Sequence, residues 1–132
     1  MTGGSGFIGG RLIERLRGDG YGVRALARSE SAAERVRERG AEPVPGDLAD
    51  RAAMRAGAQG CELAFHAAAT LGDWGDPADF RRGNVEGTAN ALGACAEAGV
   101  RRFPSIALAG RPTVVESMFL NQLKTLPVRL SP

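Results

Sequence analysis

Apolar residues recur along this chain with the two spacings that distinguish helices from strands. One helical face carries Ile8, Leu12, Ile13 and Leu16, and Tyr21–Ala27 then alternates as a strand does. The same test predicts, in chain order, a helix over residues 7–17, a strand over 21–27, a helix over 31–39, a strand over 41–44, a helix over 51–56, a strand over 62–66, a helix over 78–98 and the start of a strand at 100–103.

Glycine and capping residues separate these predicted elements. Gly18 and Gly20 suit the end of the first helix. Ser31 with Glu34 has the spacing of a capping box for the second helix, and Asp50 is a suitable N-cap for the third.

The regular rhythm stops at Pro104, because proline is unfavourable inside a sheet. We expect a structured domain over residues 1–103 and a divergent or truncated tail over 104–132, with a helix over 114–123 as the one element predicted there. A chain of 132 residues fits one domain but is small for a complete two-part enzyme.

Charge and cysteine content exclude several classes of function. The chain has 17 basic and 15 acidic residues, interleaved along the predicted helices, which indicates a solvated surface and no nucleic-acid patch. No apolar run approaches the roughly 20 residues that span a membrane, and no signal sequence precedes the first glycines. Cys61 and Cys95 lack the spacing of a metal site, so we expect reduced thiols in a cytoplasmic protein without a metal.

The first glycines carry the clearest chemical signal. Gly3, Gly6 and Gly9 have the spacing G-x-x-G-x-x-G and open the first helix. Gly3 can take a positive φ, Gly6 lacks the Cβ that would hold a diphosphate away, and Gly9 allows close packing on a neighbouring strand. Free amides at the helix start then favour phosphate. The alternative is a glycine-rich helix start with no ligand; a nucleoside-triphosphate loop is disfavoured because no Lys-Ser/Thr pair follows.

Other candidate residues lie where predicted strands end. In sheets whose strands alternate with helices, ligands bind at the carboxyl ends of the strands. Arg28 follows the strand predicted over 21–27, about 20 positions after the glycines. In a dinucleotide-binding fold an acid at this place binds the ribose 2′-hydroxyl, and an arginine suits the 2′-phosphate. We therefore favour NADP, with NAD possible; the alternative is an ordinary exposed arginine. Asp47 can accept the adenine amino group or be a turn residue, and the small side chains of 67–69 let the backbone approach a ring or sugar.

The single histidine, His66, precedes the ligand-facing turn, and we interpret it as structural. The polar loop Thr70–Pro77 contains the single tryptophan, Trp74. Its place after a strand end suits a flap over a substrate, and the alternative is a surface loop.

Four segments of the chain stand out together: Thr2-Gly3-Gly4-Ser5-Gly6-Phe7-Ile8-Gly9, Gly46-Asp47-Leu48, Phe65-His66-Ala67-Ala68-Ala69 and Asn84-Val85-Glu86-Gly87-Thr88. In their order and spacing they resemble the motifs of the extended short-chain dehydrogenase/reductase family, also called NAD-dependent epimerase/dehydratases. Gly72-Asp73-Trp74-Gly75 is similar to its branch of 3β-hydroxysteroid-type and sterol dehydrogenases. The resemblance covers residues 1–103.

The resemblance implies an α/β, Rossmann-like three-layer fold with a parallel sheet, and oxidoreduction or epimerisation of a hydroxyl-bearing small molecule. The charge pattern and the lack of a long apolar run predict no nucleic-acid or membrane partner, and a homodimer is possible. Asn84 is implied as support or proton relay near the active site. The implied cofactor contacts are Gly3, Ser5, Gly6, Phe7, Ile8, Arg28, Asp47, Leu48, Ala67, Ala68 and Ala69.

Two departures from the family shape the expectations. The family has a hydrophobic strand before Thr-Gly-Gly, where this chain has Met1. We therefore expect a sheet without its first strand, in which the strands over 21–27 and 62–66 (the family's second and fourth) lose their shared partner. The lost burial predicts marginal stability. The family's Tyr-x-x-x-Lys pair has no match: Arg24 lies three positions and Ala25 four positions after Tyr21, the single tyrosine, and the single lysine is Lys124. Ser105 lies near the family's serine but too early.

We therefore expect no catalytic residues in this chain and a missing C-terminal part. The leading interpretation is an NAD(P)-binding domain that binds its cofactor without turnover. The alternatives are a non-catalytic NADP(H)-binding or protein-interaction module, and a remnant without activity.

Overall fold

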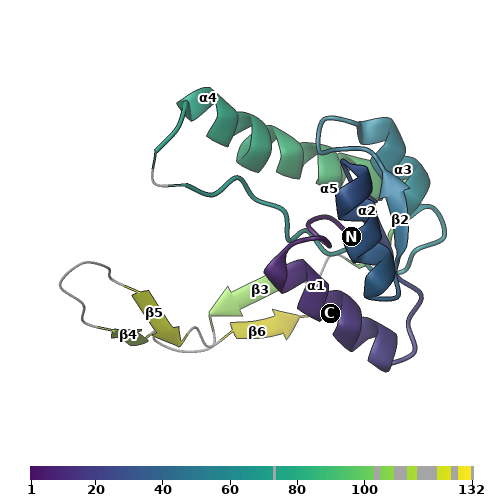
Figure 1. The fold of residues 1–132 in the computed structure, drawn as a ribbon, viewed down its shortest axis with the longest axis horizontal. Helices are drawn as coiled ribbons and strands as arrows, with labels where there is room; N and C mark the ends of the chain where they lie inside the picture. Colours follow the sequence, from purple (N-terminus) through teal and green to yellow (C-terminus); the bar gives the residue numbers. More distant parts are fainter. Residues whose placement is uncertain (73, 103–104, 109–112, 116–121, 126–127, 132) are drawn as a thin grey trace. The chain divides into compact units, whose positions relative to one another are not determined.

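The structure, a computed structural model, describes residues 1–72, 74–102, 105–108, 113–115, 122–125 and 128–131. The chain forms two compact units, Met1–Arg101 and Arg102–Pro132. Helices and strands alternate in the first unit, and short strands make up the second (Figure 1). The elements of the first unit are α1 (Phe7–Gly18), β1 (Arg24–Ala27), α2 (Glu30–Glu38), β2 (Glu42–Pro45), α3 (Arg51–Ala58), α4 (Pro77–Phe80), the π-helical η1 (Arg81–Glu86) and α5 (Gly87–Glu97).

The sheet of the first unit is parallel, and its strands are short. β1 pairs with β2 in a register that places Ala27 opposite Pro45. On the other side of β1, the Met1 carbonyl accepts a 2.9 Å hydrogen bond from the Leu26 amide, and Thr2 forms a parallel bridge with His66. The resulting order is β2, β1, Met1–Thr2 and then the segment around His66, which is the order of a Rossmann sheet.

The expectation that the predicted strands over 21–27 and 62–66 lose their shared partner is therefore wrong. Met1 and Thr2 occupy the position between them: the Thr2 amide donates to the Phe65 carbonyl (3.0 Å), and the Ala67 amide donates to the Thr2 carbonyl (3.3 Å). The pairing between Thr2 and His66 is a single bridge, and Leu63 is a second bridge residue in the segment, so the predicted strand over 62–66 is reduced to isolated bridges. The predicted marginal stability stays a prediction.

Helices cover both faces of this sheet. Successive side chains of a strand point to opposite faces: Ala25 packs with Ile13 of α1 and Val36 of α2, whereas Leu26 packs against Met54 of α3 and Ala91 of α5. The first unit is thus a three-layer α/β Rossmann-like domain, as the sequence predicts. The sequence pattern groups Ile8 with Ile13 on one face of α1, but this prediction is wrong for Ile8, because its side chain is exposed whereas that of Ile13 is buried.

The helix caps confirm one prediction and correct another. The Asp50 carboxylate accepts a hydrogen bond from the Ala53 amide and starts α3 as expected. For α2 the N-cap is Ser29, whose hydroxyl accepts from the Ala32 amide at 3.3 Å. The predicted capping box at Ser31 is therefore two residues late.

The predicted helix over 78–98 is present as the continuous run α4, η1 and α5. Its middle section is π-helical, which the apolar spacing does not predict. A Cβ on Gly83 within this section would overlap the Thr70 hydroxyl, so the glycine allows the loop before α4 to lie directly against η1.

The second unit contains two antiparallel strand pairs. β3 (Ser105–Leu108) pairs with β6 (Val128–Ser131), and β4 (Thr113–Val115) pairs with β5 (Gln122–Thr125). The predicted helix over 114–123 is therefore wrong where β4 and β5 cover it, and its middle lies outside the described residues. Of the strand predicted at 100–103, Phe103 also lies outside them, and β3 begins at Ser105. Among the helices that the structure describes, none combines the length and hydropathy needed to cross a bilayer.

Candidate functional site

Four turns emerge at one edge of the sheet in the first unit. β1 and β2 are parallel, and Thr2 and His66 are bridged in parallel, so the turns that follow all four leave at their carboxyl ends. These turns are residues 3–6, 28–29, 46–48 and 67–69. The topology therefore brings the candidate glycines, Arg28, Asp47 and the alanine segment to a common edge.

The glycine turn has the geometry that its spacing predicts. Gly3 has a φ of +73°, and its carbonyl accepts a 3.1 Å hydrogen bond from the Gly6 amide. The first helical hydrogen bond of α1 runs from the Gly10 amide to the Gly6 carbonyl, at 2.9 Å. The amides of Phe7, Ile8 and Gly9 thus precede the helical ladder and are available to an anion.

Gly9 serves a closer contact than the sequence indicates. A Cβ there would overlap the Gly3 carbonyl oxygen, so the helix start packs directly on the turn and not on a neighbouring strand. The side chains of Phe7 and Ile8 are 80% and 73% exposed. Contacts from these two residues to a phosphate are therefore expected through their backbone amides.

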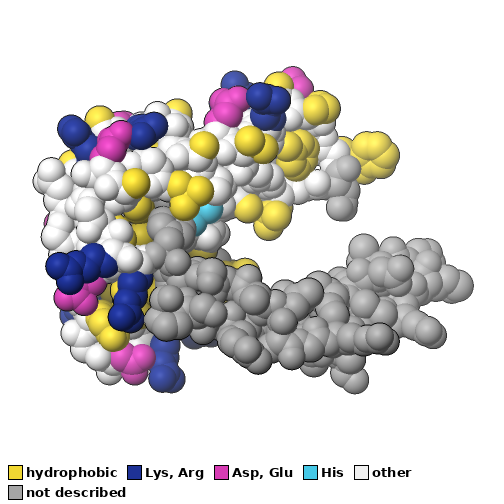
Figure 2. All heavy atoms as spheres, turned by 180° about the vertical axis from the view of Figure 1, so that it is seen from behind, with side chains coloured by type: hydrophobic (Ala, Val, Ile, Leu, Met, Phe, Trp, Pro, Cys, Tyr) yellow, Lys and Arg dark blue, Asp and Glu magenta, His cyan; other side chains and the backbone are white. Residues whose placement is uncertain are grey.

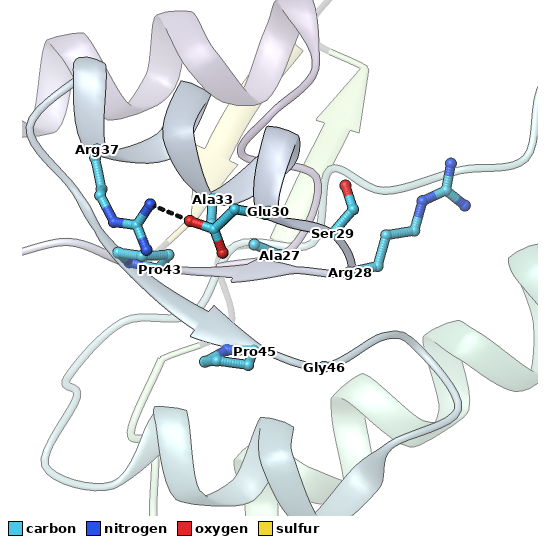
Figure 3. A pocket seen from close by; sticks show the side chains of 9 residues that line it. All are labelled: Ala27, Arg28, Ser29, Glu30, Ala33, Arg37, Pro43, Pro45 and Gly46. Carbon is cyan, nitrogen blue, oxygen red and sulfur yellow. Dashed lines mark hydrogen bonds and ion pairs between the residues drawn. The ribbon is translucent and has the colours of Figure 1, made fainter.

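A pocket of about 260 Å³ lies where β1, β2 and the start of α2 meet (Figure 3). Arg37 and Glu30 form a 2.7 Å ion pair on one side of it. Arg28 extends away from that pair, and within residues 1–72 and 74–102 its guanidinium has no hydrogen-bonded or ion-paired partner. The pocket is lined by Ala27, Arg28, Ser29, Glu30, Ala33, Arg37, Pro43, Pro45 and Gly46.

The turn at Asp47 is held from two directions. One carboxylate oxygen of Asp47 accepts hydrogen bonds from the amides of Ala49 (2.8 Å) and Asp50 (3.2 Å), so Asp47 does act as a turn residue. From α5, the Asn90 side-chain amide donates to the Leu48 carbonyl at 2.9 Å. Sequence reasoning missed Asn90, because only folding brings α5 against this turn.

The alanine segment lies against the glycine turn. A Cβ on Gly3 would come within 2.6 Å of the Ala67 carbonyl group, so the two backbones touch. The next loop is fixed by Asn84: its side-chain oxygen accepts from the Thr70 amide (2.7 Å), and its side-chain nitrogen donates to the Thr70 carbonyl (3.0 Å). Asn84 thus supports the loop that leaves this edge.

Both ring nitrogens of His66 are engaged. Nδ1 lies 2.7 Å from the Thr2 hydroxyl, and Nε2 lies 3.0 Å from the Thr88 hydroxyl. Since the Thr88 hydroxyl donates to the Asn84 carbonyl (2.6 Å), the consistent arrangement has the proton on Nε2 and Thr2 donating to Nδ1. Burial lowers the pKa of His66, which favours this neutral form. The ring shows as a small cyan area beside apolar side chains in Figure 2.

The described residues contain no group of three or more His, Cys, Asp or Glu side chains that could hold a metal ion. Cys61 and Cys95 are half-buried free thiols. Burial raises the pKa of the Cys95 thiol, so this cysteine is held in its less reactive protonated form.

This chain belongs to the NAD-dependent epimerase/dehydratase family, whose model matches residues 1–107. It is 43% identical over 102 residues to 4-hydroxy-2-methyl-3-oxo-4-farnesyl-3,4-dihydroquinoline-1-oxide ketoreductase of Stigmatella aurantiaca, a match that covers 77% of this chain and 30% of that protein. It is 34% identical over 110 residues to 3 beta-hydroxysteroid dehydrogenase/Delta 5-->4-isomerase of Mycobacterium tuberculosis, which covers 78% of this chain and 29% of that protein.

Among solved structures, a short-chain dehydrogenase/reductase superfamily protein of Agrobacterium tumefaciens with bound NAD superimposes with a TM-score of 0.62 and 34% identity, covering 77% of this chain and 30% of that one. The family and the Rossmann-like fold expected from the sequence are confirmed, and dinucleotide binding is a property of the family. The chain spans about 30% of the length of these relatives.

Proposed function

We propose that this chain binds NADP(H), with the diphosphate at the glycine turn and the ribose 2′-phosphate at Arg28. The observation that carries the proposal is the Arg28 guanidinium, which has no partner among residues 1–72 and 74–102 and lies at the same edge as the free amides of α1. A guanidinium has the fork geometry that grips a phosphate. Family members with NAD bound support a dinucleotide site, and Arg28 supports the choice of NADP.

The remaining candidate residues complete the proposed site. Asp47 keeps one carboxylate oxygen free of the turn's own hydrogen bonds and would accept the adenine amino group, with Leu48 beside it. The backbone of 67–69, next to Gly3, would face the half of the cofactor that lies beyond the diphosphate from the adenine. Asn84 would steady the loop above a substrate by its two hydrogen bonds to Thr70. The direct contacts proposed are Gly3, Ser5, Gly6, Phe7, Ile8, Arg28, Asp47, Leu48, Ala67, Ala68 and Ala69.

For the whole protein we propose hydride transfer between the nicotinamide and a keto or hydroxyl group of a small molecule. The relatives named as a ketoreductase and a hydroxysteroid dehydrogenase support this class of reaction. The bound cofactor would supply the hydride, and this chain's residues would bind and orient it. Because the sequence has no Tyr-x-x-x-Lys pair to exchange the proton, we expect this chain to bind without turnover.

Titration of the purified chain with NADPH and NADH, followed by nicotinamide fluorescence, tests the proposal. We expect NADPH to bind more tightly by about ten- to a hundredfold, since charge-assisted hydrogen bonds contribute about 1.5–3 kcal/mol. Arg28→Met should remove that preference by weakening NADPH alone. Arg15→Met is the matched control, because Arg15 pairs with Asp19 on the surface of α1.

Equal affinities for NADPH and NADH in the unmutated chain would reject the role of Arg28. Absence of binding to both would reject the proposed function and favour a remnant without activity.

An association function is a second candidate, favoured by one observation. On the helical run η1–α5, Val85 and Leu92 are 61% and 47% exposed at a spacing that places them on one face. A second copy of the chain could cover that face. Sedimentation of the chain with and without Leu92→Lys would test it; a monomer in both cases would reject it.

A further inference from the structure

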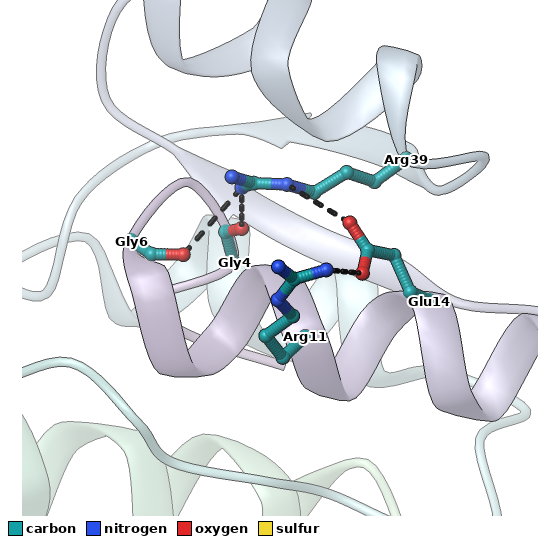
Figure 4. A network of polar contacts seen from close by, with 5 residues as sticks. All are labelled: Gly4, Gly6, Arg11, Glu14 and Arg39. Atoms are coloured by element: carbon teal, nitrogen blue, oxygen red, sulfur yellow. Dashed lines mark hydrogen bonds and ion pairs between the residues drawn. The ribbon is translucent and has the colours of Figure 1, made fainter.

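The C-terminal end of α2 reaches back to the glycine turn through one side chain. Arg39 follows α2 and precedes Gly40, whose φ of +81° turns the chain. Nη1 of Arg39 donates hydrogen bonds to the carbonyls of Gly4 (3.0 Å) and Gly6 (3.5 Å) (Figure 4). The side chain is only 27% exposed, and its Nε lies 3.9 Å from a carboxylate oxygen of Glu14 on α1.

The path of this arginine depends on Gly10. A Cβ on Gly10 would come within 2.6 Å of Arg39 Nε, and closer still to the rest of the guanidinium. Gly10 lies outside the G-x-x-G-x-x-G spacing, so the phosphate-binding pattern alone does not require a glycine there. The space that it leaves on α1 is filled by the guanidinium of Arg39.

The two accepting carbonyls determine the direction of two amides. In a trans peptide the C=O and the following N–H point in opposite directions. The hydrogen bond from Arg39 to the Gly4 carbonyl therefore directs the Ser5 amide away from Arg39. The Phe7 amide is directed the same way by two hydrogen bonds to the Gly6 carbonyl, one from Arg39 (3.5 Å) and one from the Gly10 amide (2.9 Å). Within the part of the chain that the structure describes, neither amide donates a hydrogen bond to the protein.

We propose that Arg39 is a positioning residue for the diphosphate of the cofactor: it holds the Ser5 and Phe7 amides toward the ligand from behind the turn. This inference rests on the proposed dinucleotide site. The diphosphate is common to NADH and NADPH, so Arg39 acts on both equally, whereas Arg28 acts on the 2′-phosphate alone. Preformed donors bind better because less ordering is needed when the ligand arrives.

The test compares Arg39→Met, Arg39→Lys and the control Arg15→Met with four probes: NADPH, NADH, ADP-ribose and adenosine 2′-monophosphate. We expect Arg39→Met to weaken the three diphosphate probes by a common factor of about ten, and to leave adenosine 2′-monophosphate, which has no diphosphate, unchanged. Arg39→Lys, which keeps a charged donor, should restore part of the affinity. Arg15→Met should change none of them.

Equal weakening of all four probes would show a general loss of structure and overturn the proposal, as would unchanged binding of the diphosphate probes. Amide hydrogen exchange of Gly6 without ligand gives a separate readout, because the Gly6 amide donates to the Gly3 carbonyl within the turn. Faster exchange of Gly6 in Arg39→Met supports the positioning role, and unchanged exchange rejects it. If the unmutated chain binds no probe, the proposed function fails, and this exchange measurement still decides the role of Arg39.

Discussion

The two regions that we propose bind phosphate at the edge of the sheet are built in opposite ways. The glycine turn touches protein on several sides: Gly9 lies against Gly3, Gly3 lies against Ala67, and Arg39 bonds the carbonyls behind the turn. The turn after β1 presents the long side chain of Arg28, whose guanidinium has no partner among residues 1–72 and 74–102. One region is a fixed backbone surface, and the other is a single free charged group.

This difference separates two tasks. A backbone cradle that is fixed by close contacts suits a group that every dinucleotide carries, because its donors need no reordering. A free side chain suits a group that only one of two cofactors carries, because changing it leaves the cradle intact. Substitutions in the first region should affect NADH and NADPH alike, and those in the second should alter the preference between them.

The largest expected effect comes from filling the space in the glycine turn. In Gly9→Ala the new Cβ would overlap the Gly3 carbonyl, and overpacking of this kind costs about 1–3 kcal/mol or more. We expect a lower free energy of unfolding in denaturant titration and weaker binding of both dinucleotides. Gly18→Ala is the matched control, since its Cβ would have no neighbour within 4 Å, and it should be neutral or stabilising by up to about 1 kcal/mol.

A variant Gly9→Ala as stable as the unmutated chain would contradict the description of the turn as a fixed surface.

An intermediate effect is expected at the start of α2, beside Arg28. Ser29→Ala removes the hydroxyl that accepts from the Ala32 amide, and loss of such a cap costs about 0.5–2 kcal/mol. Ser31→Ala, which removes a hydroxyl that contacts only Ser29 within the described residues, should cost less. Thermal melting of the two variants measures the difference. A larger loss in Ser31→Ala would restore the capping box that the sequence predicts.

The smallest expected effect is a pH dependence at His66, whose ring is hydrogen-bonded to Thr2, the residue before Gly3. Burial lowers the pKa of His66 below its ordinary value of 6.5, so below about pH 6.5 the unfolded chain binds a proton more readily than the folded one. Stability contributed by the neutral ring is therefore present above pH 6.5 and is lost as the pH falls toward the folded-state pKa. The melting temperature should drop between pH 7.5 and 5.5 by more in the unmutated chain than in His66→Gln.

Carboxylates and the chain terminus titrate in both proteins, so the difference between the two drops isolates the histidine. Equal drops in melting temperature would show that His66 has the same pKa in the folded and the unfolded chain.

Sequence reasoning succeeded where one local signal is sufficient. The glycine spacing predicted the positive φ of Gly3 and the start of α1, and Asp50 predicted the cap of α3. The placement of candidate residues at strand ends followed from the alternation of strands and helices, since parallel strands share one edge.

The failures concern contacts between distant parts of the chain. Arg39 lies 35 positions from Gly4, and nothing in the local pattern marks it as a partner of the turn. Asn90 reaches Leu48 from 42 positions away. The helix predicted over 114–123 failed for a different reason: Val114 and Val115 are β-branched and fit a strand, and pairing with β5 outweighs the weak helical spacing.

The nine-residue length of α2 has a consequence for how this site can change. Arg28 precedes the helix and Arg39 follows it, so the length of α2 sets the separation and relative orientation of the two arginines. Each residue added to a helix rotates its far end by about 100° and advances it by about 1.5 Å. An insertion or deletion in α2 would move Arg39 away from the Gly4 and Gly6 carbonyls or Arg28 away from the 2′-phosphate proposed for it. Cofactor preference would therefore change more easily through replacement at position 28 than through any change in helix length.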